Sequence, residues 1–354
     1  MLTIINQLPP WQRVVQWQLQ HGRHNLPWQA NRDPYRVWLS EIMLQQTQVA
    51  AVRGYFARFL AQCPDLQSLA AASQDEVLGL WSGLGYYTRA RNLHACAQQI
   101  VTRHGGVFPR SAAVLQTLPG IGRSTAAAIA SVCFGEPVAI LDGNVKRVLT
   151  RYLGFSADLS QAANERQLWT RANELVPTIQ TDTHMPRYTQ GMMDLGATLC
   201  LAKKPLCLLC PLREDCVALA QQNPQAYPVK TRKLKRSTLS LWLLWAQDPE
   251  GAIWLQQRPN QGIWGGLHCF PVFENEDALR TSVGKLAKSL VFEEPFVHVL
   301  THKDLHLHPV RLQVRAAADH PYFANRLQGV WLAASRWPAL GLPAPIRKLL
   351  EKSG

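Results

Sequence analysis

Apolar residues in the first part of the chain recur at intervals of three and four, which is the period of an amphipathic helix. The pattern is clearest in Val37–Leu44 and in Ser124–Ala130. Glycine and proline interrupt these segments at Gly105-Gly106, Pro119-Gly120 and Gly135–Pro137. Few stretches before residue 225 alternate polar and apolar residues as a half-buried strand would. This part of the chain is therefore predicted to be mainly helical.

The pattern changes in the last third of the chain. Segments 240–245 and 253–258 read as short strands, and polar and apolar residues alternate most clearly over 306–314. Helical segments are expected near 277–290 and 345–352. Because strands and helices are mixed here without a repeat, this half is predicted to be a separate α+β domain.

Helix breakers and positive charge mark the boundary between the two parts. Two X-Pro pairs are followed by a dense run of Lys and Arg over 230–236. We expect a solvated basic linker over 223–237, which could also lie along a DNA backbone. The predicted organisation is a helical domain over 1–222, this linker, and an α+β domain over 238–354. A length of 354 residues fits more than one domain.

The charge of the chain narrows its partners. Lys and Arg outnumber Asp and Glu by 37 to 24, and the formal net charge is +13. Such a surface attracts polyanions, because neutralising phosphates releases counterions, so nucleic acid, anionic lipid and acidic protein are the candidates. No apolar run approaches the roughly 18 residues of a membrane helix, and the first residues lack the features of a signal peptide. We therefore expect a cytoplasmic protein.

The cysteines fall into two groups. Four lie within seventeen residues in the spacing C-x6-C-x2-C-x5-C: Cys200, Cys207, Cys210 and Cys216. Disulfides are not expected in a reducing compartment, whereas four thiolates could bind a [4Fe–4S] cluster or tetrahedral zinc. The spacing lacks the symmetry of two zinc-ribbon knuckles and favours the cluster. The others have apolar neighbours and are expected to be buried: Cys63, Cys96, Cys133 and Cys269.

A glycine-containing turn and an aspartate follow each other at a characteristic distance. In Leu118–Ala126, Gly120 and Gly122 permit a tight turn, and the helix that follows would offer unpaired N–H groups to a phosphate. Asp142 lies about twenty residues further on. It could be a plain helix N-cap, or a carboxylate that stabilises an oxocarbenium-like transition state at a sugar.

These motifs together resemble the helix–hairpin–helix DNA glycosylases of the endonuclease III superfamily. Leu199–Cys216 is similar to the iron–sulfur loop of that superfamily, and Trp38–Val49 closely matches the MutY-type adenine DNA glycosylases. Members of that family remove adenine mispaired with 8-oxoguanine or guanine. The resemblance implies that basic residues beside the cluster face the DNA backbone: Lys203, Lys204 and Arg213.

The resemblance assigns roles to several polar residues. Glu41 corresponds to the acid that protonates adenine at N7, because adenine leaves poorly as an anion; a solvated helix glutamate is the alternative reading. On one continuous helix Glu41 would share a polar stripe with Gln45 and Gln48. Ser124 stands where bifunctional relatives carry the lysine that forms a Schiff base, and serine has no amine for that step. Hydrolysis to an abasic site is therefore expected, with a bifunctional glycosylase/lyase acting on oxidised pyrimidines as the alternative.

A base in a duplex must be flipped out before it reaches a pocket. By resemblance, Tyr86 and Gln46 would wedge into the stack, and Asn144 would help to place the sugar or the attacking water. Three residues match positions around the adenine pocket: Trp28, Gln29 and Gln190. The other candidates for DNA contact contribute a glycine backbone or positive charge: Gly120, Gly122, Arg91, Arg123 and Lys146.

The second half begins like a Nudix fold. Leu255–Leu267, with Phe270-Pro271 after it, carries this resemblance, but the glutamate-rich box that binds magnesium in Nudix hydrolases is absent. The domain is therefore expected to bind without hydrolysing, as the corresponding MutY domain does in recognising 8-oxoguanine. A Phe-Ser-His element of several relatives is replaced here by the stretch Thr301–His306. The candidates for contact with the lesion come from that stretch: His302, Lys303 and Asp304.

The expected partner is double-stranded DNA with an A:8-oxoguanine or A:G mispair, bound by a monomer without membrane contact. The expected cofactor is a [4Fe–4S] cluster. A non-catalytic DNA-binding protein that senses redox state is a rival interpretation. The pair of Glu41 and Asp142 argues against it, because binding alone needs neither carboxylate.

Overall fold

The computed structural model describes residues 8–178, 183–232, 235–314 and 319–352. The chain divides into two compact units, and neither is one continuous stretch of sequence. The first comprises Met1–Phe56, Asp65–Ala70 and Ala95–Lys233. The second comprises Ala57–Pro64, Ala71–His94 and Leu234–Gly354. No helix in the described ranges is long and apolar enough to cross a membrane.

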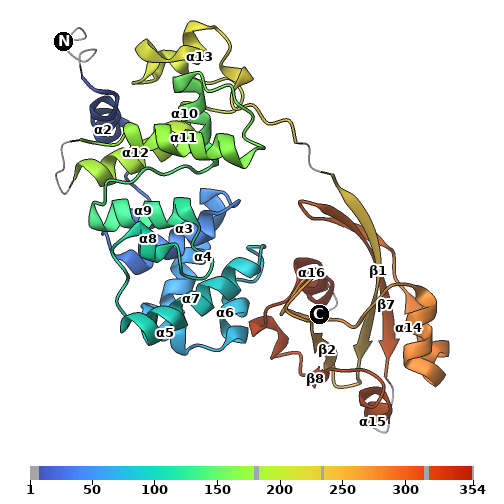
Figure 1. Ribbon diagram of the computed structural model, residues 1–354. Helices are drawn as coiled ribbons and strands as arrows, with labels where there is room; N and C mark the ends of the chain where they lie inside the picture. The colour runs from blue at the N-terminus through green and yellow to red at the C-terminus, as the bar shows by residue number, and fades with distance from the viewer. Residues whose placement is uncertain (1–7, 179–182, 233–234, 315–318, 353–354) are drawn as a thin grey trace. The chain divides into compact units, whose positions relative to one another are not determined.

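Helices alone make up the regular structure of the described chain before residue 237, as the hydrophobic period predicts (Figure 1). The helices are α2 (Pro10–His21), η1 (Pro27–Gln29), α3 (Pro34–Leu44), α4 (Val49–Gln62), α5 (Leu66–Ala71), α6 (Gln74–Leu80), α7 (Thr88–His104), α8 (Ala112–Leu115), α9 (Arg123–Phe134), α10 (Gly143–Leu153), α11 (Ala162–Glu174), α12 (His184–Thr198), η2 (Cys207–Leu209), η3 (Arg213–Asp215), α13 (Val217–Ala220) and η4 (Pro224–Ala226).

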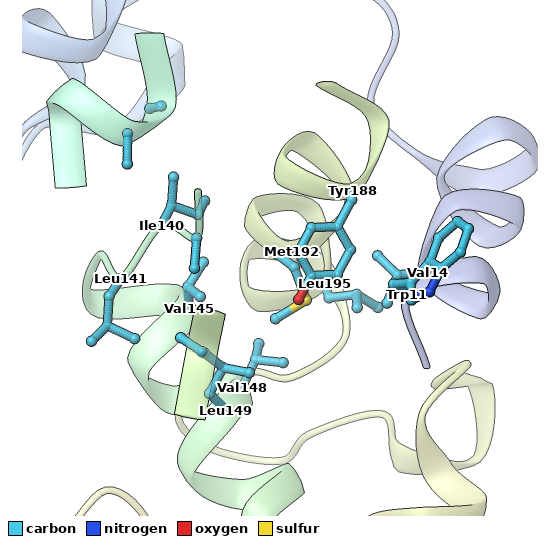
Figure 2. Packing of buried hydrophobic residues seen from close by; sticks show 14 of the residues in the cluster. Trp11, Val14, Ile140, Leu141, Val145, Val148, Leu149, Tyr188, Met192 and Leu195 are labelled. Atoms are coloured by element: carbon cyan, nitrogen blue, oxygen red, sulfur yellow. The ribbon is translucent and has the colours of Figure 1, made fainter. Parts of the chain in front are cut away.

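Helix α10 is held by an apolar core that it shares with α2 and α12. Val145, Val148 and Leu149 lie on one face of α10 and are buried, as their spacing of three and four predicts. Figure 2 shows these side chains and, from the other two helices, Val14 and Met192 of the same cluster. The helix ends at Gly154 in the left-handed conformation. Burial of this face fixes the position of the N-terminus of α10, where Asp142 stands.

Helix α3 is shorter than the sequence pattern suggested. It begins after Asp33, whose side chain accepts the N–H of Tyr35 at 3.2 Å, and it ends at Leu44. Gln46 follows with a φ of 58°, a left-handed conformation that a helix cannot contain. The expected continuous stripe of Glu41, Gln45 and Gln48 is therefore wrong, because a turn separates the two glutamines from the helix.

A mixed sheet forms the C-terminal part of the second unit. Its strands are β1 (Ser237–Gln247), β2 (Ile253–Gln257), β3 (His268–Cys269), β4 (Val272–Phe273), β5 (Leu290–Phe292), β6 (Phe296–Val299), β7 (Lys303–Gln313) and β8 (Val330–Leu332). The order is β3-β2-β1-β7-β5, with β4 paired to β1, β6 to β7 and β8 to β2. The pair β1–β7 is parallel and the others are antiparallel. The three predicted strands lie in β1, β2 and β7.

Helices cover both faces of this sheet. The helical segments are α14 (Glu276–Val283), η5 (Gly284–Ser289), α15 (Asp319–Ala324), η6 (Trp337–Ala339) and α16 (Ala344–Lys352). Alternate residues of β1 point to opposite faces, so Leu243 packs in the cluster of α16 and Leu244 in the cluster of α14. Figure 1 shows these two helices on opposite sides of the strands. The helical segment expected near 277–290 comprises α14 and η5, and only its last residue, Leu290, already belongs to β5.

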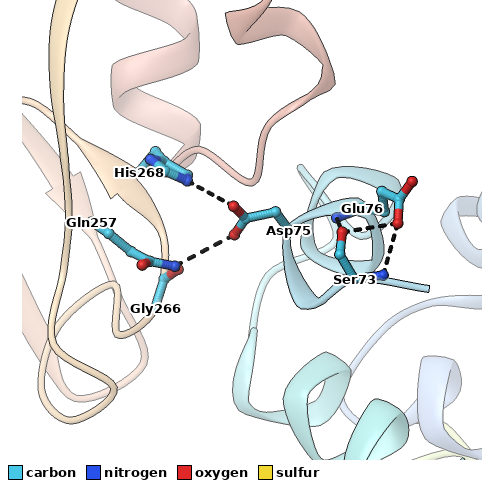
Figure 3. Close-up of polar contacts among 6 residues, drawn as sticks. All are labelled: Ser73, Asp75, Glu76, Gln257, Gly266 and His268. Carbon is cyan, nitrogen blue, oxygen red and sulfur yellow. Dashed lines mark hydrogen bonds and ion pairs between the residues drawn. The ribbon is translucent and has the colours of Figure 1, made fainter. Parts of the chain in front are cut away.

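The second unit also includes α6 and the start of α7. A capping box of Ser73 and Glu76 begins α6, and the neighbouring Asp75 accepts hydrogen bonds from two residues of the sheet domain (Figure 3). His268 Nε2 lies 3.2 Å from one carboxylate oxygen and Gln257 Nε2 lies 3.4 Å from the other. At Gly79 a Cβ atom would be 2.0 Å from the carbonyl oxygen of Ala339, so only glycine permits this approach.

The linker is not fully solvated over its described residues. The Leu159 N–H donates to the carbonyl of Val229 at 3.0 Å, and the Arg232 N–H donates to Ser160 Oγ at 3.1 Å. Residues 233–234 of the predicted linker lie outside the described residues, and strand β1 begins at Ser237. Main-chain hydrogen bonds therefore tie the segment 229–232 to the residues before α11.

Candidate active site

A cavity of about 210 Å³ in the first unit brings together residues from three parts of the chain. Trp28 and Gln29 reach it from η1, Glu41 from α3, and Gln190 from α12. Trp28 is buried and packs edge-on against Phe56, which fixes one wall. The structure thus places the three predicted pocket residues beside the predicted acid.

Glu41 is an acid whose surroundings favour the protonated form. Burial and, as the smaller cause, the negative charge of Asp142 together raise the pKa of Glu41 from 4.5 to about 7. Removing an ionised carboxylate from water is costly, and a second anion nearby adds repulsion. A carboxyl group with this pKa can both hold and release a proton near neutral pH.

Asp142 serves as a helix cap as well as lying close enough to act on Glu41. Its Oδ1 accepts the N–H of Val145 at 2.7 Å, which caps the start of α10. Ser124 Oγ accepts the N–H of Leu141 at 3.1 Å and so ties α9 to the residue before Asp142. Asn144 Oδ1 accepts a hydrogen bond from Arg147 at 2.9 Å. The aspartate is therefore fixed from both sides, which a group acting by electrostatics requires.

One wall of the cavity carries a buried network that the sequence analysis missed. Asp194 is fully buried and accepts hydrogen bonds from Gln190 Nε2 at 2.8 Å and from Arg23 Nε at 2.7 Å and N–H at 2.9 Å. Asp194 lies inside a helix between two apolar residues, and no sequence motif marks it as part of a pocket. By contrast, neither amide atom of Gln29 has a hydrogen-bond partner among the described residues. Its donor and acceptor are thus available to a ligand.

The hairpin before α9 leaves backbone donors accessible. Gly120 is left-handed with a φ of 73°, and Gly122 caps α9 without any side-chain hydrogen bond. The space around Gly122 is open, so a phosphate could approach the first N–H groups of α9. Of the predicted basic contacts, Arg123 lies over the ring of Trp169 and Lys146 pairs with Glu165.

The remaining DNA-contact candidates belong to different units. Gln46 is exposed in the turn after α3 of the first unit. In the second unit Tyr86 is 43% exposed, and its hydroxyl shares a hydrogen bond of 2.6 Å with Thr301 Oγ1. Arg91 is engaged within that unit, because it donates to the main-chain carbonyls of Gly265 and Asn260.

A second cavity, of about 610 Å³, lies beside this tyrosine in the second unit. Tyr86, Thr301, His302 and Lys303 line it together with apolar residues. The third lesion candidate, Asp304, does not line the cavity and forms an ion pair with Arg236. Thr301 is an additional polar group of this cavity that the list of candidates did not include.

The four clustered cysteines all line one pocket, together with apolar residues such as Leu212 and Pro205. Among the residues that the structure describes, no three His, Cys, Asp or Glu side chains are close enough to bind a single metal ion. Buried Arg151 donates from Nη1 to Cys200 Sγ at 3.4 Å. Of the scattered cysteines, Cys133 is partly exposed and the others are buried as expected.

Comparisons with known proteins show the family of the chain. The model of the HhH-GPD superfamily of base excision DNA repair proteins matches residues 39–174, and that of the NUDIX domain matches residues 242–352. The chain is 38% identical over 343 residues to an adenine DNA glycosylase of Buchnera aphidicola, with 96% of each protein covered. It is 44% identical over 214 residues to the human adenine DNA glycosylase, which covers 58% of this chain and 38% of the human protein.

A solved structure shares the fold of the helical part. The thermostable thymine-DNA glycosylase is 26% identical, with a TM-score of 0.52 over 60% of this chain and 95% of that protein. The family matches and this likeness confirm the predicted fold class, a helix–hairpin–helix helical part followed by a Nudix-like α+β part.

Proposed function

Because this chain belongs to the adenine DNA glycosylase family, we propose that it hydrolyses the N-glycosidic bond of adenine mispaired with 8-oxoguanine or guanine in double-stranded DNA. The observation that supports this most directly is Glu41, an acid with a pKa of about 7 on the wall of a cavity that also carries the amide of Gln29. We assign the excision to residues 1–222 and the reading of the opposite base to 238–354, joined by the linker 223–237.

The proposed reaction begins with a proton. Glu41 donates it to N7 of the flipped adenine, so that the C1′–N9 bond breaks with the electron pair going to a neutral leaving base. Asp142 stabilises the positive charge that develops on the sugar. Water then adds at C1′ and gives one proton to the Glu41 carboxylate, which restores the acid and leaves an abasic site. Asn144, next to the fixed cap of α10, helps to place the sugar or this water. Ser124 offers no amine, so no Schiff base forms and the strand stays intact.

The cavity residues recognise the base. Trp28 provides an apolar wall, while the free amide of Gln29 and the oriented amide of Gln190 supply donors and acceptors for the edge of a purine.

Other residues contact the rest of the DNA. Gln46 and Tyr86 fill the gap in the base stack, and the DNA backbone is bound by Gly120, Gly122 and Arg123. To bind a phosphate, Lys146 would have to break its ion pair with Glu165. Arg91 contributes indirectly, by holding the loop of Asn260 and Gly265 through its hydrogen bonds.

The second cavity takes the edge of the oxidised base. His302, Lys303 and Thr301 supply polar groups there, and Asp304 contributes by holding Arg236. The four loop cysteines hold a [4Fe–4S] cluster, whose chemistry here is to order the loop rather than to take part in hydrolysis. Lys203, Lys204 and Arg213 on that loop then bind phosphates.

Replacing Cys210 by serine should remove this cluster and weaken DNA binding. We expect the purified variant to lose iron and its visible absorbance, because one corner of the cluster has no thiolate. The slope of log K against log salt should fall by about 1 for each basic residue that loses its phosphate. The matched control is Cys63→Ala, which removes a buried thiol far along the sequence and should keep the iron. Full iron content in the Cys210 variant would exclude it as a ligand.

Replacing Asp194 by asparagine should destabilise the protein and slow excision. Arg23, which is 29% exposed, would lose its counter-charge, at a cost of about 1–3 kcal/mol in the free energy of unfolding. Excision should fall about tenfold, because asparagine has one acceptor oxygen where the carboxylate has two and cannot accept from both Gln190 and Arg23. Urea unfolding and single-turnover kinetics measure the two effects. The control Gln190→Ala keeps the Arg23–Asp194 pair, so it should slow excision at nearly unchanged stability.

The function itself is tested on duplex oligonucleotides with adenine opposite 8-oxoguanine or guanine, and thymine glycol as the control lesion. We expect adenine loss that becomes a strand break only after hot alkali. Direct nicking at thymine glycol would assign the protein to the bifunctional class instead. No loss of any base would refute the proposal.

A further inference from the structure

The loop before α7 has an unusual backbone. Gly83 and Gly85 have φ values of 93° and 77°, and Tyr86 has a φ of 50°. The left-handed region is open to glycine, but a tyrosine in it is strained relative to an ordinary conformation. Tyr86 is also 43% exposed to solvent. Something in the structure must therefore hold it in this conformation.

Arg89, in the first turn of α7, contacts every part of this loop. Its Nη2 donates to the carbonyl of Gly85 at 3.1 Å and to that of Leu84 at 3.4 Å, and its N–H donates to the carbonyl of Tyr86 at 2.9 Å. The guanidinium carbon lies 5.4 Å from the centre of the Tyr86 ring and 5.3 Å from that of Trp81. The indole Nε1 of Trp81 also donates to the carbonyl of Gly85, at 3.1 Å.

We propose that Arg89 is a positioning residue, whose guanidinium holds Tyr86 in its exposed left-handed conformation so that the ring is ready to enter the DNA stack. The inference rests on the proposed function, since it gives Arg89 a role only if Tyr86 acts as the wedge. It adds a residue that does not touch DNA in this role. Arg89 is only 8% exposed, and its planar group is occupied by carbonyls and rings, which leaves no free face for a phosphate.

The shape of the arginine group is what this role requires. A guanidinium is flat and carries donors in its plane, so it can contact rings with its faces while its edge donates to two carbonyls. A lysine ammonium keeps the positive charge but has neither the flat face nor the set of N–H donors in one plane. Burial lowers the pKa of Arg89 to about 10, so the group stays charged at neutral pH. Arg89→Lys therefore separates geometry from charge.

The test uses the full-length protein with its iron and a duplex that carries 2-aminopurine beside an adenine opposite 8-oxoguanine. The fluorescence of 2-aminopurine increases when its stacking is broken. We expect a clear increase with the wild type and little with Arg89→Lys, whose single-turnover excision should be slower by roughly 10- to 100-fold. Arg103→Lys, at an exposed position of the same helix, should behave as the wild type.

A second substrate distinguishes positioning from general damage. When 8-oxoguanine stays opposite the target adenine but the bases on both sides of that adenine are replaced by abasic residues, no stacked neighbour has to be displaced, and the defect of Arg89→Lys should largely disappear. An equal defect on both substrates, or a normal fluorescence increase with the variant, would overturn the inference. Trp81→Phe, which removes the Nε1 donor to the Gly85 carbonyl and part of the ring that Arg89 contacts, should give a partial loss even if the lysine variant folds poorly. Failure of the wild type to excise adenine would instead refute the proposed function.

Discussion

Replacing Glu41 by glutamine should slow adenine excision by roughly 10²- to 10⁴-fold, the range that a general acid contributes. The amide has nearly the same shape as the protonated carboxyl group but cannot give up a proton to the leaving base. Single-turnover rates on A:8-oxoguanine duplexes measure the effect, with DNA affinity as the control for correct folding. An unchanged rate would remove Glu41 from the reaction.

The same substitution should increase stability at alkaline pH. The pKa of Glu41 is about 7 in the folded protein against a reference value of 4.5, so the folded state binds the proton more tightly than the unfolded state. Its contribution is complete below pH 4.5 and is lost as the pH rises through 7. Glutamine does not ionise, and at pH 8 it should raise the free energy of unfolding by about 1–3 kcal/mol. Urea unfolding at pH 5 and pH 8 checks this sign.

The pH dependence of the wild-type rate follows from the same group. Excision needs the protonated acid, so the rate should decrease as the pH rises through about 7. A rate that increased over this range would mean that Glu41 acts as a base.

Replacing Asp142 by asparagine should reduce excision by roughly 10²- to 10³-fold with little change in stability. Asparagine is as good an N-cap as aspartate, so the hydrogen bond from Val145 is retained while the negative charge is lost. Asp142→Ala is the comparison, because it loses the cap as well and should cost about 1 kcal/mol of stability. Thermal unfolding and single-turnover assays separate the two roles of the aspartate. Full activity in Asp142→Asn would leave the residue with its cap alone.

The asparagine variant should also alter the remaining pH profile. The charge of Asp142 is one of the two causes that raise the pKa of Glu41, so its removal lowers that pKa. The residual rate should then begin to decrease at a lower pH than in the wild type. An unshifted profile would argue that the two carboxylates are not coupled.

Most of the candidate residues of the site could be named from the sequence because the patterns that mark them are local. Asp142 precedes an amphipathic helix and follows a glycine turn, and these signals lie within a few residues of one another. Gln46 illustrates the limit of such patterns. Its left-handed backbone ends α3, yet glutamine has no intrinsic preference for that conformation, so periodicity alone extended the helix.

The buried network of the pocket could not be predicted for a different reason. Asp194 and Arg23 are 171 residues apart in the sequence, and only the packing of distant segments brings the two charges together. The same holds for Thr301 beside Tyr86, which are 215 residues apart. A single sequence carries no information on such partners, whereas the roles of Glu41 and Tyr86 could be expected from their motifs.

The second unit is built from early and late segments of the sequence, and this affects how it folds during synthesis on the ribosome. Synthesis delivers α6 and the loop of Tyr86 early, but the strands against which they pack are made last. Tyr86 cannot form its hydrogen bond with the Thr301 hydroxyl until residue 301 has been synthesised. Tyr87 likewise needs the carbonyl of Leu342 as its acceptor. A nascent chain can therefore fold much of its first unit before the partners of the Tyr86 loop have been synthesised. Synthesis of the strands of the second unit, rather than folding of the helical part, then sets the moment at which the loop of Tyr86 becomes ordered.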